Sequence, residues 1–276
     1  MNWIESASTK LRYLPGLRNL GGLWNFLRPL YERVVRMTAG QRGLVRRING
    51  MDEIRILPEH RSLPEVYEPE VWKLLLPQIR AGDCIADIGA HFGIYAIAFA
   101  KRTGPQGLVL AVEADPANAG MLREHLRLNQ VESVVEVVQE ALSSEVGEVC
   151  WHSQNTQSVA IPVTADSTGF TVRMSTLDKV VAGRQVDVML VDIEGYEEPA
   201  LRGGKGLLCD IAKRPRLIVI EVHPYNWSLC GGSSASLIGF MNECGYSVHH
   251  LDGTEVTIIE RYGHVVATPL GSSAIF

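Results

Sequence analysis

Strands and helices alternate along most of the chain when the spacing of its apolar residues is read for periodicity. Short apolar runs bounded by glycine, proline or charged residues predict strands, and segments with an apolar residue every three or four positions predict helices. The predicted strands cover residues 84–88, 108–113, 134–138, 186–191 and 217–222. The predicted helices cover residues 64–80, 92–100, 116–129, 197–202 and 234–244. Strands that alternate with helices favour a parallel sheet with helices on both faces.

Three segments fall outside this alternation. Residues 146–175 contain short, partly polar strand patterns around a loop, and these predict a small β insertion. Residues 246–250 and 256–260 predict a pair of strands that closes the sheet. Residues 48–66 predict a short hairpin or an extended arm. The chain is therefore expected to form one large α/β unit with additions at its start and in its middle.

The first 47 residues differ from the rest in charge. They carry nine basic and two acidic residues, so the net charge of −5 for the whole chain leaves −12 for the remainder. Proline and glycine divide this basic segment into short amphipathic pieces, which predict a helical cap or arm over residues 1–60 ahead of a main domain over residues 61–276. A substrate lid, a dimer surface in a homo-oligomer and contact with an anionic membrane are the alternative roles.

Composition excludes several classes of protein. The five cysteines are widely spaced and form no CxxC pair, so neither a disulfide framework nor a structural zinc site is expected. No apolar run reaches the ~20 residues that span a bilayer. The negative net charge gives no general attraction to nucleic acid. We therefore expect a cytoplasmic protein that does not bind nucleic acid.

Acidic residues follow the predicted strands of the main sheet. Ligands of open α/β sheets bind beyond the carboxyl ends of the strands, so these side chains are expected to share one edge. A single acid there is often only a helix N-cap, but so many together predict a site. The residues at this edge are Asp87, Gly89, Gly93, Glu113, Asp115, Glu140, Ala141, Asp192, Glu194, Glu221 and His223.

The glycine turn after the first of these strands indicates which ligand binds. It departs from the GxGxxG pattern of dinucleotide enzymes, and Asp87 stands two residues before Gly89. A carboxylate there would repel a pyrophosphate, but it suits a cationic ligand with an amino group such as S-adenosylmethionine (SAM). Glu113, 24 residues after Gly89, has the spacing of an acid that binds ribose hydroxyls in NAD or SAM. SAM is favoured, and an NAD-dependent oxidoreductase is the alternative.

Five segments together resemble the FkbM-type methyltransferases of the class I SAM-dependent superfamily. They are DIGAHFGIYA, AVEADPANAGMLREHLRLN, STLDKVV, VDVMLVDIEGYEEPALRG and LIVIEVHP. The resemblance covers about residues 64–250 and implies a Rossmann-like, seven-stranded, mostly parallel sheet with helices on both faces and a closing antiparallel strand. It also implies methyl transfer from SAM, usually to a hydroxyl oxygen of a small molecule or a sugar-bearing natural product.

The resemblance assigns SAM-binding roles by motif position. They fall to Asp87, Gly89, Ala90 and Gly93 at the methionine end, to Glu113 at the ribose, to Ala114, Asp115, Glu140 and Ala141 at the adenine, and to Asp192 near the methyl group. His91 stands where the family commonly has asparagine.

Methyl transfer to a hydroxylated small molecule requires a base, because an alcohol must lose its proton as the new bond forms. Asp192, Glu194 and His223 are the candidates, and histidine has the most suitable intrinsic pKa, about 6.5. Asp192 is alternatively a partner for the ammonium group of SAM. Asp192, Glu221 and His223 also offer ligands to a divalent cation such as Mg²⁺, but no closely spaced ligand pair supports this, so a site without metal is favoured. A non-catalytic binding protein on the same fold is the remaining alternative.

Overall fold

The computed structural model describes residues 40–154, 157–162 and 170–272, together with the single positions 29, 33 and 37. Between residues 151 and 162 only the backbone is described. The predicted helical cap before residue 40 therefore lies mostly outside the described residues, and the domain boundary at residue 60 stays a prediction.

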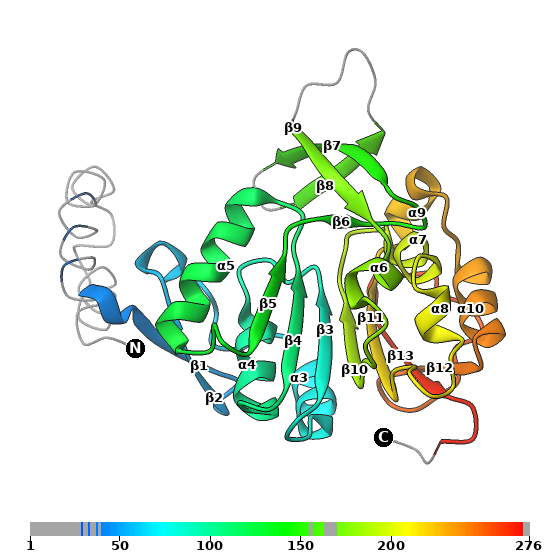
Figure 1. Ribbon diagram of the computed structural model, residues 1–276, viewed down its shortest axis with the longest axis horizontal. Coiled ribbons are helices and arrows are strands. Elements are labelled where there is room, and N and C mark those ends of the chain that lie inside the picture. The colour runs from blue at the N-terminus through cyan, green and yellow to red at the C-terminus, as the bar shows by residue number, and fades with distance from the viewer. Residues whose placement is uncertain are drawn as a thin grey trace, which may run out of the picture.

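Seven strands form the central sheet, in the order β12-β13-β11-β10-β3-β4-β5 (Figure 1). They are β3 (Cys84–Ile88), β4 (Leu108–Val112), β5 (Val135–Val138), β10 (Val188–Val191), β11 (Leu217–Val222), β12 (Tyr246–His250) and β13 (Gly263–Pro269). Neighbouring strands are parallel except at β13, which is antiparallel to both β11 and β12. The predicted seven-stranded, mostly parallel sheet with one closing antiparallel strand is confirmed.

The predicted closing strand over residues 256–260 is wrong. This segment is a loop. It is joined to β12 by a hydrogen bond from the Val256 N–H to the Val248 carbonyl, next to the bridge between His249 and Glu255. Its apolar pattern arises because Val256 and Ile259 anchor the loop in the core, with 4% and 7% exposed. The strand that closes the sheet begins later, at Gly263.

Helices cover both faces of the sheet, because successive side chains of each buried strand point to opposite sides. One face packs against α3 (Pro69–Leu75), α4 (Ile94–Thr103) and α5 (Pro116–Asn129). The other face packs against α6 (Leu177–Val181), α7 (Glu197–Arg202), α8 (Lys205–Leu208), α9 (Pro224–Cys230) and α10 (Ser234–Glu243). None of the helices in the described part of the chain is long and apolar enough to cross a membrane.

A hairpin precedes the main sheet, as one of the two alternatives for residues 48–66 predicted, but it starts earlier. Strands β1 (Leu44–Ile48) and β2 (Asp52–Ile56) pair antiparallel, and their apolar side chains belong to the same core as α4 and α5. The Asn129 side chain at the end of α5 bonds both the N–H and the carbonyl of Arg55, at 2.9 and 2.7 Å. Short 3₁₀ helices lie at Gly40–Arg42, Pro58–His60 and Leu76–Gln78.

The predicted β insertion is confirmed as a second sheet of four strands in the order β6-β9-β7-β8. Its strands are β6 (Ala141–Leu142), β7 (Gly147–Gln154), β8 (Gln157–Pro162) and β9 (Phe170–Ser175). Figure 1 shows β7, β8 and β9 above the carboxyl ends of β3, β4 and β5. The insertion therefore lies over the edge where the sequence predicts the ligand.

Candidate active site

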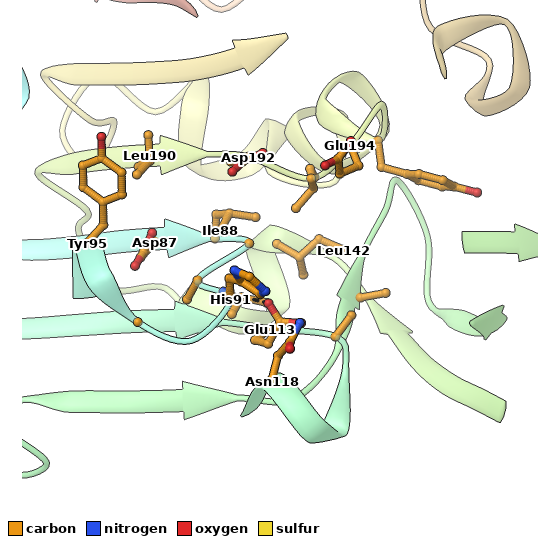
Figure 2. A pocket seen from close by; sticks show the side chains of 18 of the residues that line it. Asp87, Ile88, His91, Tyr95, Glu113, Asn118, Leu142, Leu190, Asp192 and Glu194 are labelled. Carbon is orange, nitrogen blue, oxygen red and sulfur yellow. Dashed lines mark hydrogen bonds between the residues drawn. The ribbon is translucent and has the colours of Figure 1, made fainter. Parts of the chain in front are cut away.

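A cavity lies at the carboxyl ends of β3, β4 and β10, partly covered by the insertion (Figure 2). All the predicted SAM-binding residues line it except Asp115. They are Asp87, Gly89, Ala90, Gly93, Glu113, Ala114, Glu140, Ala141 and Asp192. The candidate base Glu194 lines it as well, whereas the candidate base His223 lies beside it.

The turn between β3 and α4 requires glycine at two positions. Gly89 has φ of +88°, and a Cβ there would lie 1.7 Å from the carbonyl oxygen of Asp192. Gly93 has φ of +92°, and a Cβ there would lie 2.3 Å from Cδ1 of Leu122. The backbone contact at Gly89 excludes any side chain, and the positive φ at both positions favours glycine. The glycines therefore allow the first turn to pack directly against the turn after β10 and against α5.

Glu113 is held by the backbone around it. Its Oε2 accepts the His91 N–H and its Oε1 accepts the Asp115 N–H, both at 2.8 Å, while the Asn118 amide donates to Oε1 at 3.4 Å. Burial raises the pKa of Glu113, and these hydrogen bonds oppose that shift. A carboxylate oxygen has two lone pairs, so Oε2, which accepts one N–H group, retains capacity for a hydroxyl of a ribose. Figure 2 shows Glu113 beside Asn118, a lining residue that the sequence reasoning missed.

Asp87 has an uncompensated carboxylate. It is 2% exposed, and its Oδ2 has no hydrogen-bond partner in the described part of the chain. Burial raises its pKa to about 7, and the charge of Glu113 adds to this. A buried acceptor without a partner in a cavity wall fits an amino group, and the added positive charge would favour the ionised carboxylate. Asp87 therefore fits the ammonium group of SAM, and Glu113 fits its ribose.

One part of the cavity wall is apolar. Leu142 of β6, Val149 of β7 and Met174 of β9 line it, so the insertion supplies part of the cavity. Glu140 lies at this wall and pairs with Arg173 at 3.1 Å. An apolar slot next to a hydroxyl-binding acid suits the flat adenine ring of a nucleoside.

Asp115 has a structural contact instead of a place in the lining. Its carboxylate accepts the N–H groups of Ala117 and Asn118 at 2.7 and 3.2 Å, as the N-cap of α5. The cap stabilises the helix that carries Asn118. Asp115 does not line the cavity, and its place beside the adenine stays a prediction.

His223 is oriented by a buried carboxylate. Its Nδ1 lies 2.7 Å from Oε1 of Glu197, which is 0% exposed and also accepts the Gly195 N–H and the Trp227 indole N–H at 2.7 and 2.8 Å. In the neutral imidazole, a carboxylate with these donors favours the proton on Nδ1, so that Nε2 has the lone pair. The sequence reasoning missed Glu197, although it is the last acid of the motif DIEGYE.

The free Nε2 of His223 faces the other candidate bases. Glu194 Oε2 is 3.6 Å from it and Asp192 Oδ1 is 3.9 Å from it. Burial lowers the pKa of His223, but the hydrogen bond and charge of Glu197 and the charge of Glu194 outweigh this and raise it. Burial and the charge of Glu221 raise the pKa of Asp192 well above its usual range. The three predicted bases therefore converge on one point at the rim of the cavity.

Two groups of possible metal ligands share Glu221. Asp192, Glu221 and His223 place one ligand atom each within 4.8 Å of one another, which is closer than the sequence spacing indicated. Glu68, Glu221 and His264 do the same. The sequence reasoning missed Glu68 and His264. His264 could have been predicted only if the closing strand had been placed correctly. The amino end of an antiparallel strand lies at the carboxyl edge of the parallel strands, and His264 is near the amino end of β13.

The seven-stranded sheet and the glycine turn after β3 have the arrangement of the SAM-dependent methyltransferase fold. The family model for the methyltransferase FkbM domain matches residues 87–248, which is more than half of the chain. The chain belongs to the FkbM methyltransferase family, in agreement with the resemblance of its five motifs.

Solved structures with a similar chain path include several methyltransferases. One is a SAM-dependent O-methyltransferase from Thermotoga maritima, at 13% identity, with 84% of this chain and 79% of that chain covered and a TM-score of 0.44. Another is an O-methyltransferase from Bacillus cereus in complex with SAH, at 16% identity, with 76% and 86% covered and a TM-score of 0.42. A third is a precorrin-6y C5,15-methyltransferase from Geobacter metallireducens, at 13% identity, with 78% and 94% covered and a TM-score of 0.43. No curated protein sequence matches the chain.

Proposed function

We propose that this protein transfers a methyl group from SAM to a hydroxyl oxygen of a small-molecule or sugar-containing, natural-product-like acceptor. The observation that carries the proposal is the pairing of His223 with Glu197 beside the cavity: a histidine that is 2% exposed keeps one ring nitrogen free at the cavity rim. The substrate class, the cytoplasmic location and the absence of a nucleic-acid partner are parts of the same proposal.

The donor side supports SAM rather than NAD. Asp87 and Glu113 are both buried and acidic, and they lie on either side of the glycine turn. A pyrophosphate would meet two carboxylates there, whereas SAM brings an ammonium and a sulfonium and no phosphate. When bound, SAM supplies a methyl group that is already activated for displacement, so the protein needs only to position the acceptor and remove a proton.

The acceptor side supports transfer to oxygen. An alcohol becomes a good nucleophile only if its proton leaves as the new bond forms. Nε2 of His223 accepts that proton, and Glu197 stabilises the resulting imidazolium through the 2.7 Å hydrogen bond to Nδ1. Glu194 and Asp192, at 3.6 and 3.9 Å from Nε2, add further negative charge around the proton acceptor.

Two exposed tyrosines flank the proposed base. The rings of Tyr225 and Tyr262 lie 5.7 and 5.3 Å from the His223 ring, and they are 57% and 58% exposed. Such rings offer apolar faces with a hydroxyl at the rim. They form a platform for an acceptor that combines apolar surface with hydroxyl groups.

Calorimetry with SAM and with NAD tests the donor. We expect SAM to bind and NAD not to bind. Glu113→Gln weakens SAM binding by about 1–2 kcal/mol, because the NH2 group of the amide donates where a carboxylate oxygen of Glu113 accepts. Glu132→Gln, an exposed acid elsewhere on the chain, is the matched control and leaves the affinity unchanged. Binding of NAD in place of SAM would replace the proposal with the oxidoreductase alternative.

A screen of hydroxylated acceptors tests the acceptor chemistry. Each acceptor is incubated with SAM, with and without Mg²⁺, and the product is analysed by mass spectrometry and NMR. We expect the added methyl group on oxygen. A product methylated on nitrogen would overturn this part of the proposal, and SAM binding without turnover on any acceptor would favour the non-catalytic alternative.

A further inference from the structure

We propose that Glu68, Glu221 and His264 bind a divalent transition-metal ion next to the SAM cavity. Neither Glu68, Glu221 nor His264 lines that cavity, so the proposed ion has a position distinct from that of the donor.

The fold brings the three side chains together from distant parts of the chain. Glu221 and His264 are directly opposite each other in the antiparallel pair β11–β13, so their side chains point to the same face of the sheet. That face packs against α3, and Glu68 is the residue before its first turn. The Glu68 side chain makes no capping hydrogen bond with the helix, which leaves its carboxylate for other partners.

His264 provides the observation that points to a ligand. Its imidazole is 12% exposed, and its buried Nε2 atom has no hydrogen-bond partner in the described part of the chain. Nε2 lies 3.5 Å from Oε2 of Glu68 and 3.8 Å from Oε2 of Glu221, too far for hydrogen bonds. Ligands about 2.1 Å from a tetrahedral zinc ion lie about 3.4 Å apart, so this spacing fits one ion between the three atoms.

The two carboxylates lack a partner with a permanent positive charge, and the basic group beside them is His264 itself. No lysine or arginine of the described residues forms an ion pair with Glu68 or Glu221, and Asp192 adds a third carboxylate that raises the local repulsion. Uncompensated carboxylates in a buried place require a proton or a cation. SAM would not supply that charge directly, because Glu68 and Glu221 are not in the wall that it contacts.

Tyrosines hold both carboxylates in place. The Tyr95 hydroxyl donates to Oε2 of Glu68 at 2.9 Å, and the Tyr262 hydroxyl donates to Oε1 of Glu221. Hydrogen bonds of this kind from a second layer of residues orient the ligands in metal sites. The cluster therefore has the ligands and the supporting contacts that metal binding requires.

The donor set indicates which ion binds. One imidazole nitrogen with two carboxylates suits Mn²⁺, Co²⁺ or Zn²⁺ better than Mg²⁺ or Ca²⁺, which prefer oxygen alone. Glu221 also belongs to the group with Asp192 and His223. An ion bound to Glu221 would neutralise the negative charge of that carboxylate, and His223 would remain available for the proton of the acceptor. This consequence for catalysis rests on the proposed function.

Metal binding to the full chain tests the inference without any acceptor. The protein is freed of metal with a chelator and titrated with Mn²⁺, and the loss of the free Mn²⁺ signal is followed by electron paramagnetic resonance. We expect one ion bound per chain. Glu68→Gln and His264→Ala should each weaken binding at least about tenfold, which is about 1.4 kcal/mol.

Two further variants make the result specific. Glu70→Gln changes an exposed acid two residues from Glu68 and should bind Mn²⁺ as the wild type does. His264→Cys should still bind Co²⁺ and should add a thiolate-to-cobalt absorption band, which a purely structural role for His264 would not produce. Calorimetry with SAM on the metal-free protein keeps this test separate from the proposed function.

Three results would overturn the inference. They are no Mn²⁺ binding by the wild type, binding that survives both Glu68→Gln and His264→Ala, and binding that is lost only in Asp192→Asn or His223→Ala. The last result would assign the ion to the other group around Glu221.

Discussion

The donor side and the acceptor side of the site differ in the contacts that their carboxylates make. On the donor side, Glu113 accepts two backbone N–H groups from the segment around it, and its position is fixed before any ligand binds. On the acceptor side, Glu68, Asp192 and Glu221 meet one another and two histidines across several elements, with few donors between them. The donor side is therefore pre-organised by local backbone, whereas the acceptor side stores unfavourable charge that a proton, an acceptor or an ion would relieve.

Removing the proposed base tests the acceptor side with the largest expected effect. We expect His223→Ala to lower the methylation rate by about 10²–10⁴-fold, the usual contribution of a general base. The affinity for SAM should change less than about twofold, because His223 does not line the cavity. Initial rates with an acceptor from the screen, together with calorimetry for SAM, measure both quantities.

His250→Ala is the matched control, because this exposed histidine lies at the end of the edge strand β12. Its rate should equal that of the wild type. If His223→Ala retained the full rate while SAM still bound, the acceptor proton would leave through another group and the acceptor side would need a different base.

Unlike Glu113, Asp87 on the donor side has a carboxylate oxygen without a hydrogen-bond partner in the described part of the chain. The pH dependence of the free energy of unfolding tests how unfavourable its buried charge is. Burial raises its pKa from 3.8 to about 7. Between these values the folded protein holds a proton that the unfolded chain has released, so the free energy of unfolding falls as the pH rises from about 4 to about 7. Each pKa unit corresponds to about 1.4 kcal/mol, so the loss reaches about 4 kcal/mol at most.

Asp87→Asn should remove this loss. Thermal unfolding between pH 4 and pH 8 is expected to show a smaller decline in the variant than in the wild type, and calorimetry is expected to show weaker binding of SAM. Glu132→Gln, at an exposed position elsewhere on the chain, is the control and should keep the slope of the wild type. Parallel declines in Asp87→Asn and the wild type would mean that the stored charge lies elsewhere.

The same contrast explains what the sequence could predict. Asp87, Gly89 and Glu113 belong to strand–turn–helix units that are continuous in the chain, so local pattern was enough to find them. Asp192 and His223 were found because parallel strands share a carboxyl edge. Glu68 and His264 were missed because their meeting depends on tertiary structure: His264 reaches the edge only through the register of β13, which the apolar loop at residues 256–260 concealed.

Gly89 connects the two sides, and its replacement tests whether they must stay in backbone contact. Gly89→Ala puts a Cβ against the Asp192 carbonyl at a φ of +88°. The positive φ costs about 1–2 kcal/mol and the overlap about 1–3 kcal/mol, so we expect the free energy of unfolding to fall by about 3 kcal/mol. Gly231→Ala, in the left-handed region at a φ of +77° and without a close contact, should lose only about 1 kcal/mol in urea denaturation. Equal losses would mean that the contact relaxes.

The smallest expected effect concerns the ion pair between Glu140 and Arg173 at the part of the cavity wall that lies near the insertion. The Arg173 side chain is 77% exposed, so solvent screens the pair, although Glu140 itself is only 21% exposed and lines the cavity. Exposed pairs contribute about 0.2–1 kcal/mol, so Arg173→Ala should change the Kd for SAM by less than about threefold. Glu140→Ala should weaken SAM binding more than Arg173→Ala, because it alters the cavity wall directly. If Arg173→Ala proved the more damaging variant in calorimetry, the donor side would depend on a tertiary ion pair, and its contrast with the acceptor side would lose its basis.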